Sequence, residues 1–106
     1  MSAATKGIYI VAAKRTAFGT FGGALKNISQ TQLQTSAAKA ALDAAGLKGD
    51  QVDTVTIGNV IASSSVDGIY VPRHVGLNCG VPIEKPALGV NRLCGSGFQS
   101  IVNGAQ

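Results

Sequence analysis

Apolar side chains gather along the chain in three short runs that predict three strands. Residues 7–13 form a continuous apolar run with β-branched side chains, which is typical of a strand buried on both faces of a parallel sheet. Residues 52–61 alternate between polar and apolar positions and then become apolar. A third and briefer apolar run covers residues 87–91. We expect these three segments to be the strands of the fold.

The segment between the first two predicted strands carries signals for both ends of a helix. Ser29 and Gln32 have the spacing of a capping box, so a helix is expected to begin at Ser29. Ile28 and Leu33 stand at the positions of a hydrophobic staple, and Gly46 is the expected stop. Apolar side chains recur on one face of this helix, at Leu33, Ala37, Ala40, Ala41 and Ala44. Such an alanine-rich face predicts close packing against the sheet.

Two shorter helices are expected further along the chain. Pro72 suits a first helical turn, and the apolar segment that follows it stops at Gly80. A third helix is expected to start at Cys94, because apolar residues then recur at helical spacing. These residues are Phe98, Ile101, Val102 and Ala105.

The order β-α-β-α-β-α predicts an α/β fold, with a mostly parallel sheet, right-handed crossovers and helices on both faces. The third helix is still in its apolar pattern at Gln106, with no capping residue beyond it. We therefore expect residues 1–106 to form one domain that is incomplete at its C-terminal end.

Composition is typical of a globular protein. Hydrophobic residues make up 45% of the chain and charged residues 13%, which argues against disorder. The net charge of +4 comes from scattered basic residues with no stripe of Lys and Arg, so a nucleic-acid partner is not expected. No apolar run is long enough to span a membrane. The glycine-rich stretch at 19–23 lacks the order of a phosphate-binding or dinucleotide-binding loop, so no bound cofactor is expected there.

The opening of the chain is basic and free of acidic residues up to Asp43. Organellar import signals share this composition, so the stretch is compatible with such a role. The basic residues in it are Lys6, Lys14, Arg15, Lys26 and Lys39.

The two cysteines, Cys79 and Cys94, match no metal-ligand spacing and are expected to be free thiols. Cys94 lies between a predicted strand and a predicted helix, in a turn that we expect Gly95 and Gly97 to make tight. Unpaired backbone N–H groups at a helix N-terminus favour a thiolate and could also receive an oxyanion. The alternative is that Cys94 is a small buried apolar residue, as most free cysteines are.

Residues 90–101, with the sequence VNRLCGSGFQSI, resemble the acyl-enzyme signature of the thiolase family. The likeness extends back through RTAFG at 15–19, FGG at 21–23, KAAL at 39–42 and GNV at 58–60, and so covers nearly the whole chain. Two departures are visible. Ala17 stands where the family usually has proline, and the chain ends just before the last apolar position of the signature.

The resemblance implies a thiolase-like fold, of which residues 1–106 are the first part of the N-terminal domain, with the C-terminal domain absent. It also implies that Cys94 is the acyl-accepting nucleophile, with a backbone N–H as oxyanion donor. The similarity is greatest to the branch that cleaves 3-ketoacyl-CoA with CoA in mitochondrial β-oxidation. CoA is then a substrate, no cofactor or metal is permanently bound, and the full-length protein is expected to be a homo-oligomer of the mitochondrial matrix. The cytoplasm is the alternative location.

The family also uses a histidine and a second cysteine, which lie in glycine-rich segments far downstream. His74 and Cys79 stand in other motifs, so we expect packing or surface roles for both. Activity is therefore expected only of the full-length protein. Two alternatives remain open, namely an acetoacetyl-CoA thiolase and a truncated fragment or interaction module without catalytic activity.

Overall fold

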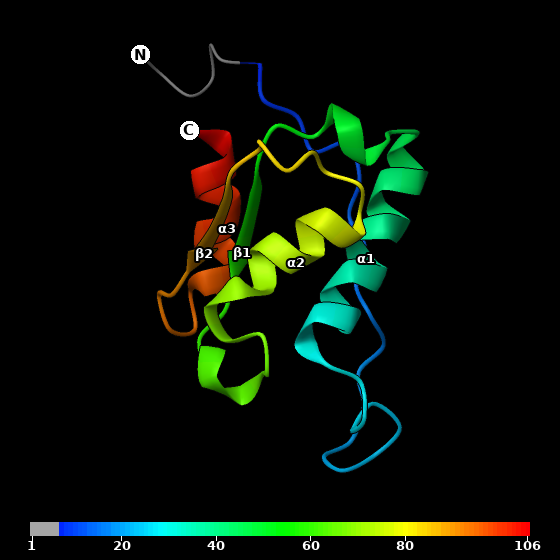
Figure 1. Ribbon diagram of the computed structural model, residues 1–106, viewed down its shortest axis with the longest axis vertical. Coiled ribbons are helices and arrows are strands. Elements are labelled where there is room, and N and C mark those ends of the chain that lie inside the picture. The colour runs from blue at the N-terminus through cyan, green and yellow to red at the C-terminus, as the bar shows by residue number, and fades with distance from the viewer. Residues whose placement is uncertain (1–6) are drawn as a thin grey trace.

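The computed structural model describes residues 7–106 and shows helices packed about a parallel pair of strands (Figure 1). Its regular elements are α1 (Gln30–Ala45), β1 (Val55–Gly58), α2 (Val71–Asn78), β2 (Ala87–Val90) and α3 (Ser96–Ala105). Short 3-10 turns at 49–51, 62–64 and 68–70 lie in the connections. No helix in this part of the chain is long and apolar enough to cross a membrane.

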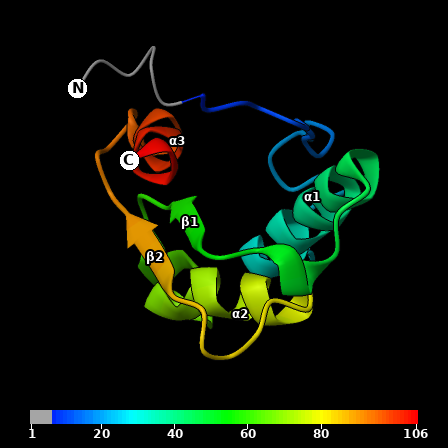
Figure 2. The ribbon, with the colours of Figure 1, turned by 90° about the horizontal axis from the view of Figure 1, so that it is seen from above.

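β1 and β2 pair in parallel, with Val55 opposite Ala87 and Gly58 opposite Val90. The ladder continues at the far end, where the Asn59 N–H donates to the Val90 carbonyl at 2.9 Å. Seen from above, α3 lies over one face of this pair and α2 over the other, with α1 beside α2 (Figure 2). The predicted α/β architecture, a parallel sheet with helices on both faces, is therefore confirmed.

Helix α1 begins and ends as its sequence predicts. Ser29 accepts a hydrogen bond from the Gln32 N–H at 3.1 Å, and the Gln32 side chain accepts one from the Ser29 N–H at 2.9 Å. Gly46 closes the helix in the left-handed conformation, at φ 67°. The predicted apolar face is partly wrong, because Ala40 and Ala44 are exposed. Alanines stand at neighbouring positions around α1, so their spacing alone could not select one face.

The strand predicted at residues 7–13 is absent from the described residues. Tyr9 and Ile10 are 81% and 79% exposed, and this segment makes no backbone hydrogen bond with β1 or β2 in the described part of the chain. An apolar β-branched run is the composition of a buried strand, but a strand also needs a neighbour with which to form its ladder. Toward the end of the segment, Val11 and Ala12 line an apolar cavity of about 260 Å³ between α1, β1 and α2.

The core is small and lies between β1 and α2. Ile57, Val71 and Val75 are its buried side chains, and Ala38 of α1 packs against them. The predicted apolar face of α3 contributes little to it, since Phe98 is 73% and Ile101 63% exposed. The fold thus buries one face of β1 well and leaves an apolar surface on α3.

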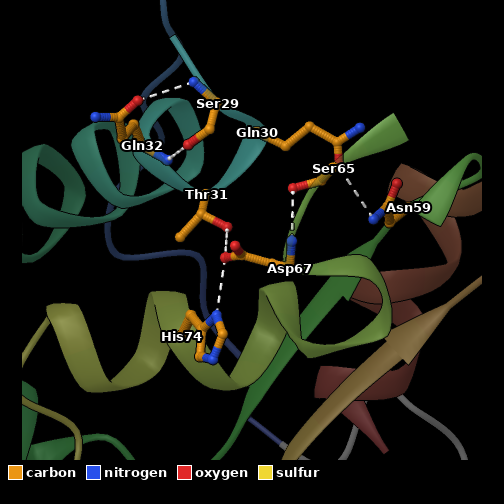
Figure 3. Close-up of polar contacts among 8 residues, drawn as sticks. All are labelled: Ser29, Gln30, Thr31, Gln32, Asn59, Ser65, Asp67 and His74. Carbon is orange, nitrogen blue, oxygen red and sulfur yellow. Dashed lines mark hydrogen bonds and ion pairs between the residues drawn. The ribbon is translucent and has the colours of Figure 1, made fainter. Parts of the chain in front are cut away.

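A polar cluster ties the first turn of α1 to the connection before α2 (Figure 3). The hydroxyl of Thr31, which is only 7% exposed, donates to Asp67 Oδ2, and His74 Nδ1 lies 2.8 Å from the same oxygen. Ser65 Oγ accepts a hydrogen bond from the Asp67 N–H at 3.3 Å. The hydrogen bonds from Thr31 and His74 hold the pKa of the Asp67 carboxyl below its usual value, because they favour its charged form.

This lowered pKa predicts a specific loss of stability in acid. Since the Asp67 pKa is lower in the folded chain than in the unfolded chain, its contribution is complete above the ordinary aspartate pKa of about 4 and is lost as the pH falls below it. Asp67→Asn should therefore unfold more easily at pH 7 and show a smaller loss of stability between pH 7 and pH 3. Urea unfolding of the full-length protein at both pH values measures this. Asp43→Asn, at an exposed position of α1, is the control, and an equal acid dependence in the Asp67→Asn chain would contradict the assignment.

Candidate active site

Cys94 is exposed and lies in the short connection between β2 and α3. Helix α3 begins at Ser96 with Gly95 as its N-cap, so the helix starts two residues later than the sequence predicts. The cysteine therefore precedes the helix N-terminus. Its thiol is accessible, which excludes the alternative that Cys94 is a buried packing residue in the described chain.

The tight conformation of this turn is at Leu93 and not at the glycines. Leu93 has φ 47°, in the left-handed region that residues other than glycine, asparagine and aspartate rarely adopt. Gly95 has φ −87°, which any residue can adopt, and a side chain added at Gly97 would meet open space. The expectation that Gly95 and Gly97 make the turn tight is thus wrong, because the reversal occurs immediately before the cysteine.

Ser96 holds the two sides of the turn together from inside. Its side chain accepts a hydrogen bond from the Arg92 N–H at 2.9 Å and donates one to the Leu93 carbonyl at 2.6 Å. The residue is only 3% exposed, so water cannot easily replace these bonds. The hydroxyl thus connects the backbone before Cys94 to the first residue of α3.

The end of β1 approaches the start of α3 so closely that only glycine fits there. A Cβ atom at Gly58 would lie 2.6 Å from both the carbonyl carbon and the oxygen of Ser96, and 2.8 Å from the Gly97 nitrogen. These are backbone atoms, which cannot rotate away. Gly58 therefore sets the height of the α3 N-terminus above the sheet.

Two backbone donors at the start of α3 are free to bind a ligand. Among residues 7–106, the N–H groups of Gly97 and Phe98 donate no hydrogen bond, and the first turn of α3 carries no acidic residue. Both groups lie at the positive end of the helix dipole. An anion that forms on an acyl group beside Cys94 could be accepted there.

The structure does not bring His74 or Cys79 to this turn. His74 is on α2, across the sheet from α3, where it binds Asp67 and stacks on Tyr70 with ring centroids 6.1 Å apart (Figures 2 and 3). Cys79 is partly buried beside the apolar cavity, and burial raises the pKa of its thiol despite the opposing charge of Lys39. Both contacts fit the predicted packing and surface roles. The described residues hold no cluster of His, Cys, Asp or Glu suited to a metal ion.

Comparison with known proteins identifies the family. Residues 8–106 match the model of the thiolase N-terminal domain. The chain is 59% identical to human mitochondrial 3-ketoacyl-CoA thiolase over 101 residues, which is 95% of this chain and 25% of the human protein. It is 40% identical to an acetyl-CoA acetyltransferase of Clostridioides difficile, over 88% of this chain and 85% of that sequence.

Solved structures agree. The crystal structure of human mitochondrial 3-ketoacyl-CoA thiolase in complex with CoA matches with a TM-score of 0.87 and 60% identity, over 91% of this chain and 24% of that chain. The chain belongs to the thiolase family, whose members are acyltransferases, and the resemblance seen at residues 90–101 is confirmed. It spans about a quarter of the length of the human relative.

The close approach at Gly58 predicts a large effect of a single methyl group. Gly58→Ala should lower the free energy of unfolding by about 1–3 kcal/mol or more, since neither backbone can move without disturbing the β1–α3 contact. Gly104→Ala is the matched control, because a Cβ there meets no atom within 4 Å. This change, in a helix, should stabilise the chain by about 0.5–1 kcal/mol. Urea unfolding of both variants of the full-length protein decides the point, and equal stability of the two would refute the proposed clash.

Proposed function

We propose that Cys94 is the nucleophile of a thiolase reaction that cleaves 3-ketoacyl-CoA. The observation that carries this proposal is an exposed thiol directly before the N-terminus of α3, within the family signature and beside two unpaired N–H donors. A helix N-terminus favours a thiolate, which is the nucleophilic form of cysteine. The surroundings of Cys79 lack these features.

In the proposed reaction the Cys94 thiolate attacks the 3-keto carbonyl carbon of the substrate. The bond between C2 and C3 then breaks, its electron pair stays on C2, and protonation of C2 releases acetyl-CoA. The shortened acyl group remains on Cys94 as a thioester. The thiolate of a second CoA attacks this thioester, releases Cys94 and leaves as the shortened acyl-CoA. The N–H groups of Gly97 and Phe98 are the candidate donors to the oxyanion that forms in each attack.

We also propose that residues 1–106 are the N-terminal part of a longer thiolase subunit. A base for Cys94, an acid for C2 and the groups that hold CoA are then supplied by segments further along. The human relative, whose solved structure contains CoA, is about four times as long as the matched part, which supports this division. In the full-length protein CoA is a substrate, and no permanently bound cofactor or metal is needed.

The degradative reaction of β-oxidation is the proposed physiological role, with the mitochondrial matrix as the location and a homo-oligomer as the assembly. The higher identity to the mitochondrial 3-ketoacyl-CoA thiolase, 59% against 40% for the acetyl-CoA acetyltransferase, supports it. An acetoacetyl-CoA thiolase is the second candidate, since the relative at 40% identity is named acetyl-CoA acetyltransferase and acetyl transfer to a second acetyl-CoA forms acetoacetyl-CoA. Rates with short and long 3-ketoacyl-CoA substrates separate the two.

If Cys94 is the nucleophile, removing its sulfur atom should cause a severe loss of activity. In the full-length protein, Cys94→Ala should lower the rate of acetyl-CoA release by roughly 10³-fold or more while leaving the fold intact. Cys94→Ser should be nearly as inactive, because a hydroxyl ionises far less readily than a thiol. Cys79→Ala is the matched control and should keep most of the turnover. Near-normal turnover in either Cys94 variant would exclude Cys94 as the nucleophile.

Residues 1–106 expressed alone should show no thiolysis and should aggregate or fold only in part. Apolar side chains of α3, including Phe98 and Ile101, are exposed, because the isolated chain offers few partners to bury them. Each such side chain contributes about 1.5–3 kcal/mol when buried, so a few of them equal the stability of a small domain. Thermal unfolding and an acetyl-CoA assay test this, with the full-length protein as control. A soluble monomer with a sharp transition would contradict the folding part, and turnover would contradict the need for later segments.

A further inference from the structure

Leu93, in the turn before Cys94, has a backbone conformation that is unfavourable for a residue with a side chain. Leu93 has φ 47°, where the Cβ of an L-residue crowds its own backbone. Its side chain is 69% exposed, so burial of the leucine does not explain why the conformation is kept. Such an outlier persists only where the surrounding contacts hold it.

Asn91 supplies those contacts from the end of β2. Its Oδ1 accepts a hydrogen bond from the Leu93 N–H at 3.0 Å, and its Nδ2 donates to the Val60 carbonyl at 3.2 Å. The first bond is an Asx-type contact that favours reversal of the chain. The second fixes the side chain to the segment that follows β1. One amide group thus ties the strained residue to the sheet.

We propose that Asn91 is a positioning residue that directs the Cys94 thiol toward the N-terminus of α3. Leu93 immediately precedes Cys94, so its backbone angles decide where the cysteine side chain points. Ser96 fixes the carbonyl side of Leu93, and Asn91 fixes its N–H side. With both in place, the backbone that carries Cys94 is held in one conformation before substrate arrives. This inference rests on the proposed role of Cys94 as nucleophile.

The test uses the full-length protein and two measurements. The first is the rate at which iodoacetamide alkylates Cys94 without substrate, followed by peptide mapping. The second is kcat and KM for CoA. Asn91→Ala should lower both the alkylation rate and kcat by about tenfold, with a smaller change in KM, because misplacement of a reacting group acts on the chemical step. Asn78→Ala, at an exposed position of α2, is the matched control and should leave both unchanged.

Two further variants separate positioning from a general loss of structure. Asn91→Asp keeps an oxygen that can accept from the Leu93 N–H but loses the donor to the Val60 carbonyl, so its alkylation rate and kcat should lie between those of the unsubstituted protein and of Asn91→Ala. Leu93→Gly removes the crowding, since glycine adopts positive φ readily, so adding Asn91→Ala to it should have much less effect than Asn91→Ala has alone. These two variants also decide the matter if Asn91→Ala does not fold.

The proposal is overturned if Asn91→Ala alkylates and turns over at the rate of the Asn78→Ala control. It is equally overturned if Asn91→Ala has the same effect with and without Leu93→Gly. Failure of the nucleophile role would appear differently, as turnover that survives Cys94→Ala. Alkylation needs no substrate and no acyl transfer, so it reports on the orientation of Cys94 in either case.

Discussion

The position of the thiol depends on the contact between the end of β1 and the start of α3. At Gly58 the strand backbone lies against the backbone of Ser96 and Gly97, with no room for a methyl group between them. That contact fixes the helix start relative to the sheet, and the turn that joins β2 to α3 must then reverse within a few residues. The chain reverses there through the left-handed conformation of Leu93, which the side-chain hydrogen bonds of Asn91 and Ser96 hold in place.

The parallel pairing of β1 and β2 places the candidate site and the core at different parts of the sheet. Parallel strands end at the same edge of a sheet, so Asn59 and Asn91 come out side by side. Asn59 donates to Gln30 in the first turn of α1, and Asn91 donates to the Val60 carbonyl. The turn with Cys94 is therefore joined through the sheet edge to α1 and, through the cluster around Asp67, to α2. The other face of the sheet holds the small core, which provides support and takes no part in the proposed chemistry.

Features set by neighbouring residues could be predicted from the sequence, and those set by distant segments could not. Helix α1 was predictable from Ser29 to Gly46, because its caps are local hydrogen bonds. The strand expected at 7–13 was not correct, since a ladder depends on a partner that composition does not reveal. Cys94 could be chosen as the candidate nucleophile from the signature around it. The need for glycine at Gly58 depends on a segment almost forty positions later, so it could not be predicted from the pattern. An asparagine two residues before Leu93 is a usual turn signal, but Asn91 also acts through Val60, and that contact could not be predicted.

The polar contacts that hold the candidate site also bear on how fast the fold can form. Thr31 with Asp67, Gln30 with Asn59 and Asn91 with Val60 join residues 36, 29 and 31 positions apart. Contacts between distant residues require loop closure first, and a chain dominated by them folds more slowly than one dominated by local contacts. Helix α1 can form early because its caps are local. The contact of Asn91 with Val60 joins the ends of β2 and β1, so we expect it to form only after these strands have paired and the candidate thiol to acquire its orientation late in folding.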